Sequence, residues 1–143
     1  MFVVDANVLL YAINQASPHH RRARPWLDDA LAGREPVGFA WTVVLAFLRL
    51  ATHPAVFARP LTPEQALAAV RGWLAQPSAT IVEPTGRHLD ILAGLLVESG
   101  TAANLVGDAH LAALAVERDA TIVSFDADFG RFAGVRIVAP PPS

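Results

Sequence analysis

Residues Met1–Leu9 read Met-Phe-Val-Val-Asp-Ala-Asn-Val-Leu, and the rest of the fold can be worked out from this stretch. The apolar run Phe2–Val4 predicts a short strand buried on both faces, as in the middle of a parallel sheet. Residues 8–13 then have the pattern of a helix, so Asp5 lies where a strand ends and a helix begins. Ligands of open α/β sheets bind beyond the carboxyl ends of the strands, so Asp5 is a candidate for chemistry. The alternative is that Asp5 only caps the helix.

The last third of the chain repeats this arrangement of strand and acid. Residues 120–125 predict a buried strand, and Asp126 and Asp128 follow it directly. The helix predicted over residues 104–118 carries Asp108 near its start, on the same side as its apolar residues. An acid on an inward side needs a partner. The alternatives are that Asp108 only interacts with the helix dipole and that Asp126 or Asp128 only forms an Asx turn.

Between the two ends, strands alternate with helices. Strands are predicted at residues 37–40, 80–83 and 135–138, and helices at residues 18–32 (interrupted at Pro25), 43–51 (capped by Thr42), 63–75 and 85–99. This alternation predicts an α/β fold whose mostly parallel sheet has helices on both faces. Right-handed crossovers then bring all carboxyl ends to one edge of the sheet. We expect a single domain over residues 1–139 and a Pro-rich tail, 140–143, outside it.

Composition excludes several classes of protein. The chain has 143 residues, 53% of them hydrophobic, yet no apolar run approaches the roughly 18 residues of a membrane span. The net charge of −2 does not supply a dominant basic surface, and His19–Arg22 with Arg24 is expected to be a solvated helix face. Without cysteine there are neither disulfides nor thiolate metal sites, and with no signal peptide we expect a cytoplasmic protein.

Three carboxylates are expected at one edge of the sheet, from Asp5, Asp108 and Asp126. Close together they repel one another, and a hard divalent cation such as Mg²⁺ or Mn²⁺ removes that conflict while leaving room for a phosphate. The hypothesis is therefore metal-assisted phosphodiester hydrolysis, with Asp128 assisting the metal through water. Asn7 is expected either to orient Asp5 or to satisfy backbone at the helix start, and Ser124 to hydrogen-bond a carboxylate.

Four stretches together carry a resemblance to a known family: residues 3–9, 47–52, 108–115 and 121–129. In this order and spacing the chain resembles a PIN-domain ribonuclease, and more narrowly a VapC-type toxin of a type II toxin–antitoxin pair. The resemblance implies a five-stranded parallel sheet in an α/β/α sandwich, dependence on Mg²⁺ or Mn²⁺, and endonucleolytic cleavage of RNA. It also implies a homodimer and a cognate antitoxin whose tail fills the active-site groove.

The chain departs from the family pattern on the helix that contains residues 43–51. The family usually carries a glutamate just ahead of the Phe-Leu-Arg stretch, whereas residues 42–46 contain no acid. Glu35 and Glu64 are conceivable substitutes, and Arg49 is not expected to take part in catalysis. The alternative function is therefore a catalytically weak or inactive PIN-like domain that binds RNA or a partner protein. Receiver-like and dehalogenase-like domains need a lysine, which this chain lacks.

Overall fold

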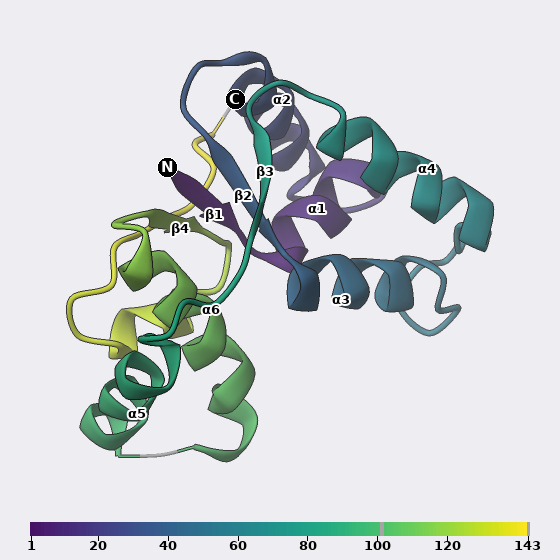
Figure 1. The fold of residues 1–143 in the computed structure, drawn as a ribbon. Coiled ribbons are helices and arrows are strands. Elements are labelled where there is room, and N and C mark those ends of the chain that lie inside the picture. Colours follow the sequence, from purple (N-terminus) through teal and green to yellow (C-terminus); the bar gives the residue numbers. More distant parts are fainter. Residues whose placement is uncertain (101, 143) are drawn as a thin grey trace.

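The computed structural model describes residues 1–100 and 102–142, which form an α/β/α sandwich (Figure 1). The described strands are β1 (Phe2–Val4), β2 (Val37–Ala40), β3 (Ala79–Val82), β4 (Thr121–Val123) and β5 (Ile137–Val138). They pair in the order β3-β2-β1-β4-β5, and every pairing is parallel. The predicted five-stranded α/β/α architecture is confirmed.

Six helices surround the sheet in the described chain: α1 (Ala6–Ile13), α2 (His20–Ala32), α3 (Trp41–Ala51), α4 (Pro63–Leu74), α5 (His88–Ser99) and α6 (Val106–Glu117). In Figure 1, α1 to α4 gather on one side of the strands and α5 and α6 on the other. Two short 3-10 helices, η1 (Ala103–Leu105) and η2 (Ala127–Arg131), precede α6 and follow β4. No helix in the described part of the chain has the length and apolar character that a membrane crossing needs.

The capping residues in the sequence predicted some helix ends correctly and others incorrectly. The Thr62 side chain accepts from the Gln65 amide and completes a capping box for α4, and Gly100 ends α5 with a φ of 72°. The prediction that Thr42 caps the next helix was wrong, because α3 follows β2 directly and Ala40 is its N-cap. Pro25 does not restart α2, which runs unbroken through it.

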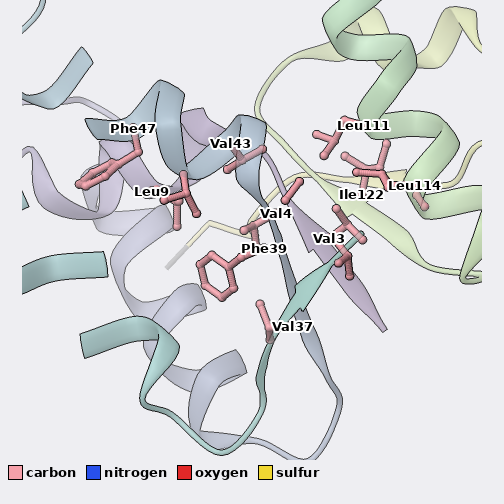
Figure 2. Close-up of a cluster of buried hydrophobic side chains, with 14 of the residues drawn as sticks. Val3, Val4, Leu9, Val37, Phe39, Val43, Phe47, Leu111, Leu114 and Ile122 are labelled. Atoms are coloured by element: carbon pink, nitrogen blue, oxygen red, sulfur yellow. The ribbon is translucent and has the colours of Figure 1, made fainter. Parts of the chain in front are cut away.

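The core occupies both faces of the sheet. Figure 2 shows Leu9, Phe39 and Phe47 on one side of the central strands and Leu111 and Leu114 on the other. The central strands β1 and β4 are flanked by helices on both faces, which explains why Val3, Val4, Ile122 and Val123 are apolar and buried without alternation. This packing holds the carboxyl ends of the two strands next to each other.

The prediction that the Pro-rich tail lies outside the fold was wrong for its first residue. Pro140 is buried, and its carbonyl accepts hydrogen bonds from Nε and Nη2 of Arg22 at 2.9 and 2.6 Å. A carbonyl that receives two donors of one guanidinium is held firmly. The tail is therefore attached to α2 at Pro140, and Arg22 does not belong to a solvated face.

We expect Gly38→Ala to destabilise the protein, because Gly38 lies inside β2 between two neighbouring strands. A Cβ atom there would lie 2.8 Å from Cγ1 of Val82 and 3.2 Å from the backbone oxygen of Phe2. Overpacking of this kind costs about 1–3 kcal/mol, measurable by urea unfolding. Gly72→Ala on α4 is the matched control, since its Cβ meets nothing within 4 Å and alanine favours a helix. Equal stability of the two variants would contradict the expectation.

Candidate active site

Asp5 both caps a helix and faces the carboxyl edge of the sheet. Its backbone amide donates to the carbonyl of Val123 at 2.9 Å, which extends the pairing of β1 with β4 by one residue. Its carboxylate Oδ1 accepts the Ala6 amide at 2.7 Å as the N-cap of α1. The cap and the site are therefore one feature and not alternatives, because the second oxygen, Oδ2, points to the end of β4.

Ser124 links the acids of β1 and β4. Its buried hydroxyl donates to Oδ2 of Asp5 at 2.7 Å and accepts the Asp126 amide at 2.9 Å. The Asn7 side chain donates to the same hydroxyl oxygen at 3.1 Å and accepts the Phe125 amide at 3.2 Å. Ser124 and Asn7 thus hold the Asp5 carboxylate and the turn after β4 in one hydrogen-bonded unit.

Asp126 begins η2 as its N-cap. Its Oδ1 accepts the Asp128 amide at 2.8 Å, so the Asx turn considered for this position is present. Asp128 is exposed and pairs with Arg131, whose Nη2 lies 3.4 Å from Oδ1 of Asp128. Arg131 is a site residue that the sequence reasoning missed. The available signal was its spacing of three residues from Asp128, which places both on one side of a helical turn.

The four acids share one electrostatic environment. Burial raises the pKa of Asp5 and the charge of Asp126 adds to this rise, although hydrogen bonds from Ser124 and Ala6 oppose it. Burial also raises the pKa of Asp108, and the charges of Asp5, Asp126 and Asp128 raise it further, against the opposing charge of Arg131. Asp108 comes from α6 on the other side of the sheet, so three separate segments bring these carboxylates near each other.

This donor set suits a hard cation in its chemistry but is not a closed metal site. Carboxylate oxygens are the ligands that Mg²⁺ and Mn²⁺ prefer, and burial, followed by the charges of neighbouring acids, raises the pKa of both Asp5 and Asp108. Among the residues that the structure describes, however, no group of three histidine, cysteine, aspartate or glutamate side chains is arranged to hold a metal ion. The four acids are close enough for their charges to raise the pKa of Asp5 and Asp108, and we call them the acid cluster.

Neither glutamate considered as a replacement for the family's missing acid joins this cluster. Glu35 lies just before β2 and pairs with the amino group of Met1 at 2.7 Å, at the opposite edge of the sheet from Asp5. Glu64 is exposed in the first turn of α4, and it is not among the charges that act on Asp5 or Asp108. In the described chain, no glutamate is among the charges that act on Asp5 or Asp108.

His110 on α6 contacts the neighbouring helix α5. His110 is half-buried, and its Nδ1 lies 2.9 Å from Nε2 of His88 on α5. Nδ1 of His88 lies 3.2 Å from Oε2 of Glu117, and Oε1 of Glu117 accepts the amide and hydroxyl of Thr85 at 3.2 and 2.8 Å. This chain of polar contacts joins α5 to α6, the helix that carries Asp108. These contacts have no signal in the sequence, because the residues that form them are 22 to 32 positions apart.

We expect Glu117→Ala to lower stability at neutral pH by about 1 kcal/mol, because it removes the acceptor of hydrogen bonds from the exposed Thr85 and the half-buried His88. Burial raises the pKa of Glu117, but the hydrogen bonds from Thr85 and His88 outweigh it and the net pKa is lowered. A lowered folded-state pKa stabilises the protein above the ordinary value of 4.5 and loses that contribution as the pH falls through the folded value. Wild type should therefore lose more stability than Glu117→Ala below about pH 4.5, as measured by thermal unfolding at several pH values. Parallel pH profiles for the two proteins would contradict this account.

Comparison with known proteins agrees with this geometry. The PIN domain family matches residues 2–135 of the chain. Ribonuclease VapC37 of Mycobacterium tuberculosis is 61% identical over 141 residues, which cover 99% of this chain and 98% of that protein. Ribonuclease VapC33 of the same species is 44% identical over 140 residues, which cover 98% of each chain.

Solved structures show the same fold at much lower identity. VapBC2 from Rickettsia felis, bound to a DNA fragment from its promoter, superposes with a TM-score of 0.71 at 17% identity over 96% of this chain and 97% of that one. VapC20 of Mycobacterium tuberculosis, a toxin that cleaves the sarcin-ricin loop, gives a TM-score of 0.69 at 18% identity over 95% and 99% of the chains. With the family match and the near full-length relatives, these findings show that the chain belongs to the PIN-domain family, and within it to the VapC ribonucleases.

Proposed function

We propose that this protein is a divalent-metal-dependent endoribonuclease that acts as the toxin of a toxin–antitoxin pair. The observation that carries the proposal is the carboxylate cluster of Asp5, Asp108, Asp126 and Asp128 at the carboxyl edge of the sheet, in a chain that belongs to the VapC ribonucleases. Bare carboxylates repel an RNA phosphate, so this cluster can bind the phosphate for cleavage only when a cation neutralises its charge.

The residues divide into ligands and supports. Asp5, Asp108 and Asp126 would hold Mg²⁺ or Mn²⁺ directly, and Asp128 through a water molecule. When bound, the cation supplies charge stabilisation at phosphorus and activates a water for hydrolysis. Ser124 keeps one oxygen of Asp5 oriented by its 2.7 Å hydrogen bond, and no protein side chain serves as a covalent nucleophile.

Asn7 has a second role in this scheme because it controls the distance between two of the ligands. Its amide contacts both the Ser124 hydroxyl and the Phe125 backbone, so it ties α1, which Asp5 begins, to the turn that carries Asp126. Supporting contacts of this type orient metal ligands and typically change metal affinity about 10–100-fold when removed. Asn7 and Ser124 are therefore proposed as positioning residues.

The proposed partners are an RNA substrate, a cognate antitoxin protein and a second copy of the chain, in the cytoplasm. Several solved relatives of this fold are toxin–antitoxin complexes, among them VapBC-1 from nontypeable Haemophilus influenzae. On α3, Trp41 and Leu45 are 51% and 59% exposed. Large exposed apolar side chains one turn apart support a protein-binding role for this helix.

The test is cleavage of cellular RNA by the purified protein, freed of any antitoxin, with Mg²⁺, Mn²⁺ or a chelator. Discrete fragments that require metal are expected. A folded protein that leaves RNA intact under every condition would contradict the proposal. It would favour the binding-only alternative, which we consider because α3 lacks the glutamate of the family pattern. An RNA-binding measurement on the same preparation would then separate an inactive RNA-binding domain from one that binds only protein.

A further inference from the structure

Next to the acid cluster lies a group of aromatic rings that the proposed chemistry does not use. Tyr11, His19 and Phe125 are all half-buried. The ring centroids of Tyr11 and His19 lie 4.8 Å apart, those of His19 and Phe125 4.8 Å, and those of Tyr11 and Phe125 5.2 Å. The three rings come from α1, from the residue before α2, and from the turn after β4, and we call them the aromatic cluster.

The aromatic cluster is held in place from behind. The guanidinium of Arg22 lies 5.2 Å from the centroid of Phe125, and its other contacts are the two hydrogen bonds to the buried Pro140. Nδ1 of His20 lies 2.9 Å from the backbone oxygen of Tyr11, and the amide of His19 donates to the Ser17 hydroxyl. The rings are therefore ordered before any ligand arrives, which lowers the entropic cost of binding.

The polar tips of the aromatic cluster remain available. Neither the Tyr11 hydroxyl nor a ring nitrogen of His19 hydrogen-bonds to any residue that the structure describes, and the described chain contains no buried side-chain nitrogen or oxygen without a partner. Both tips therefore reach solvent. A cluster that served packing alone would not need a hydroxyl and an imidazole at its surface, since apolar rings fill such a space without polar atoms.

Two connections place the aromatic cluster close to the acids, one along the turn after β4 and one along α1. Phe125 directly precedes Asp126, and Asn7, whose Oδ1 accepts the Phe125 amide, lies one turn before Tyr11 on α1. Side chains four residues apart on a helix face are about 5–6 Å apart, so Tyr11 lies close to Asn7, which contacts the hydroxyl that holds Asp5. A strand whose phosphate sits at the acids therefore brings a neighbouring nucleotide to the aromatic cluster.

We propose that the aromatic cluster binds one nucleobase of single-stranded RNA beside the cleaved phosphate, with the base lying against His19 and Tyr11 and hydrogen-bonding to their polar tips. This rests on the proposed ribonuclease function and makes His19 and Tyr11 specificity-determining residues. Aromatic side chains bind bases by stacking without adding charge, and in an acidic chain with net charge −2 that contact offsets the phosphate repulsion of the acids.

The test compares RNA with and without bases. Binding of fluorescent single-stranded 10-mers of A, C, G or U, and of an abasic 10-mer of equal charge, is measured by anisotropy in chelator, where no cleavage occurs. Wild type is expected to bind at least one base-containing 10-mer about 5-fold or more tighter than the abasic one. His19→Ala and Tyr11→Ala should reduce that ratio several-fold while leaving abasic binding unchanged.

Conservative variants and a matched control keep the result specific. His19→Phe and Tyr11→Phe retain the rings and should restore affinity for bases while changing which base is preferred. His53→Ala, an exposed histidine beyond the far end of α3, should behave as wild type. In the metal-dependent cleavage assay, the two alanine variants should raise KM and leave kcat nearly unchanged.

The outcomes separate the two proposals. If metal-dependent cleavage occurs but the base-to-abasic ratio of His19→Ala and Tyr11→Ala equals that of wild type, the base site is overturned and the ribonuclease stands. If wild type itself does not distinguish base-containing from abasic RNA, the base site is overturned as well. Loss of cleavage in wild type with intact base-dependent binding would instead overturn the ribonuclease and keep the base site.

Discussion

We expect Asp5→Asn to reduce metal-dependent RNA cleavage by more than about a hundredfold in kcat, the size of loss seen when one electrostatic partner of a transition state is removed. Asp5 is the proposed ligand with the most fixed position, because one oxygen accepts the Ala6 amide and the other the Ser124 hydroxyl. Asparagine keeps the size of the side chain and one acceptor but loses the charge that would attract the cation. The measurement is single-turnover cleavage of a defined RNA fragment.

A control for this variant is Asp28→Asn on α2. Asp28 is exposed, and its ion pair in the described chain is with Arg24, at 3.1 Å, so its replacement removes the same charge from the protein without touching the cluster. Circular dichroism should show that both variants remain folded. If Asp5→Asn cleaves RNA as fast as Asp28→Asn, Asp5 does not belong to the active site. This conclusion does not depend on the results for the other three acids.

Asp108→Asn should stabilise the protein in the absence of metal and remove most of its stabilisation by Mn²⁺. Burial and the neighbouring carboxylates raise the pKa of Asp108 above its ordinary value of 3.8. A raised carboxyl pKa means that ionisation costs stability, so the contribution of Asp108 turns unfavourable as the pH rises above 3.8 and stays so at pH 7. Asparagine carries no such cost, so the Tm of the metal-free variant should exceed that of wild type.

A bound cation reverses this order. A ligand at a hundred times its Kd stabilises the folded state by about 2.7 kcal/mol, so saturating Mn²⁺ should raise the Tm of wild type by several degrees and that of Asp108→Asn much less. Asp90→Asn is the matched control, because Asp90 is also a first-turn acid, on α5, and lies outside the cluster. If Mn²⁺ raises the Tm of wild type and Asp108→Asn equally, Asp108 is not a ligand.

Some features of this protein were determined by the sequence on its own. The apolar pairs Val3–Val4 and Ile122–Val123 predict buried parallel strands, and the structure pairs the two strands that contain them directly. The order of strands and helices along the chain then restricts the topology, since parallel connections are right-handed. From this alone, Asp5 and Asp126 were expected at one edge of the sheet, as local consequences of where strands end.

Other features depended on contacts between residues far apart in the chain. The hydrogen bond from Ser124 to Asp5 spans 119 positions, and the one from Arg22 to Pro140 spans 118. Local pattern carries no signal for such pairs, so the sequence placed Arg22 on a solvated face and Pro140 outside the fold. Both residues are instead parts of the support behind Phe125.

The polar contacts from Glu117 to His110 and the contacts of the aromatic cluster also join residues far apart in the chain. A histidine on a helix has the same local preference whether it faces water or a partner helix, because helix propensity does not depend on what the far side of the side chain meets. The sequence therefore determined the sheet and the edge at which chemistry is expected. Only the tertiary structure decided which side chains share that edge, because close packing of separate elements, and not local preference, sets the distances between them.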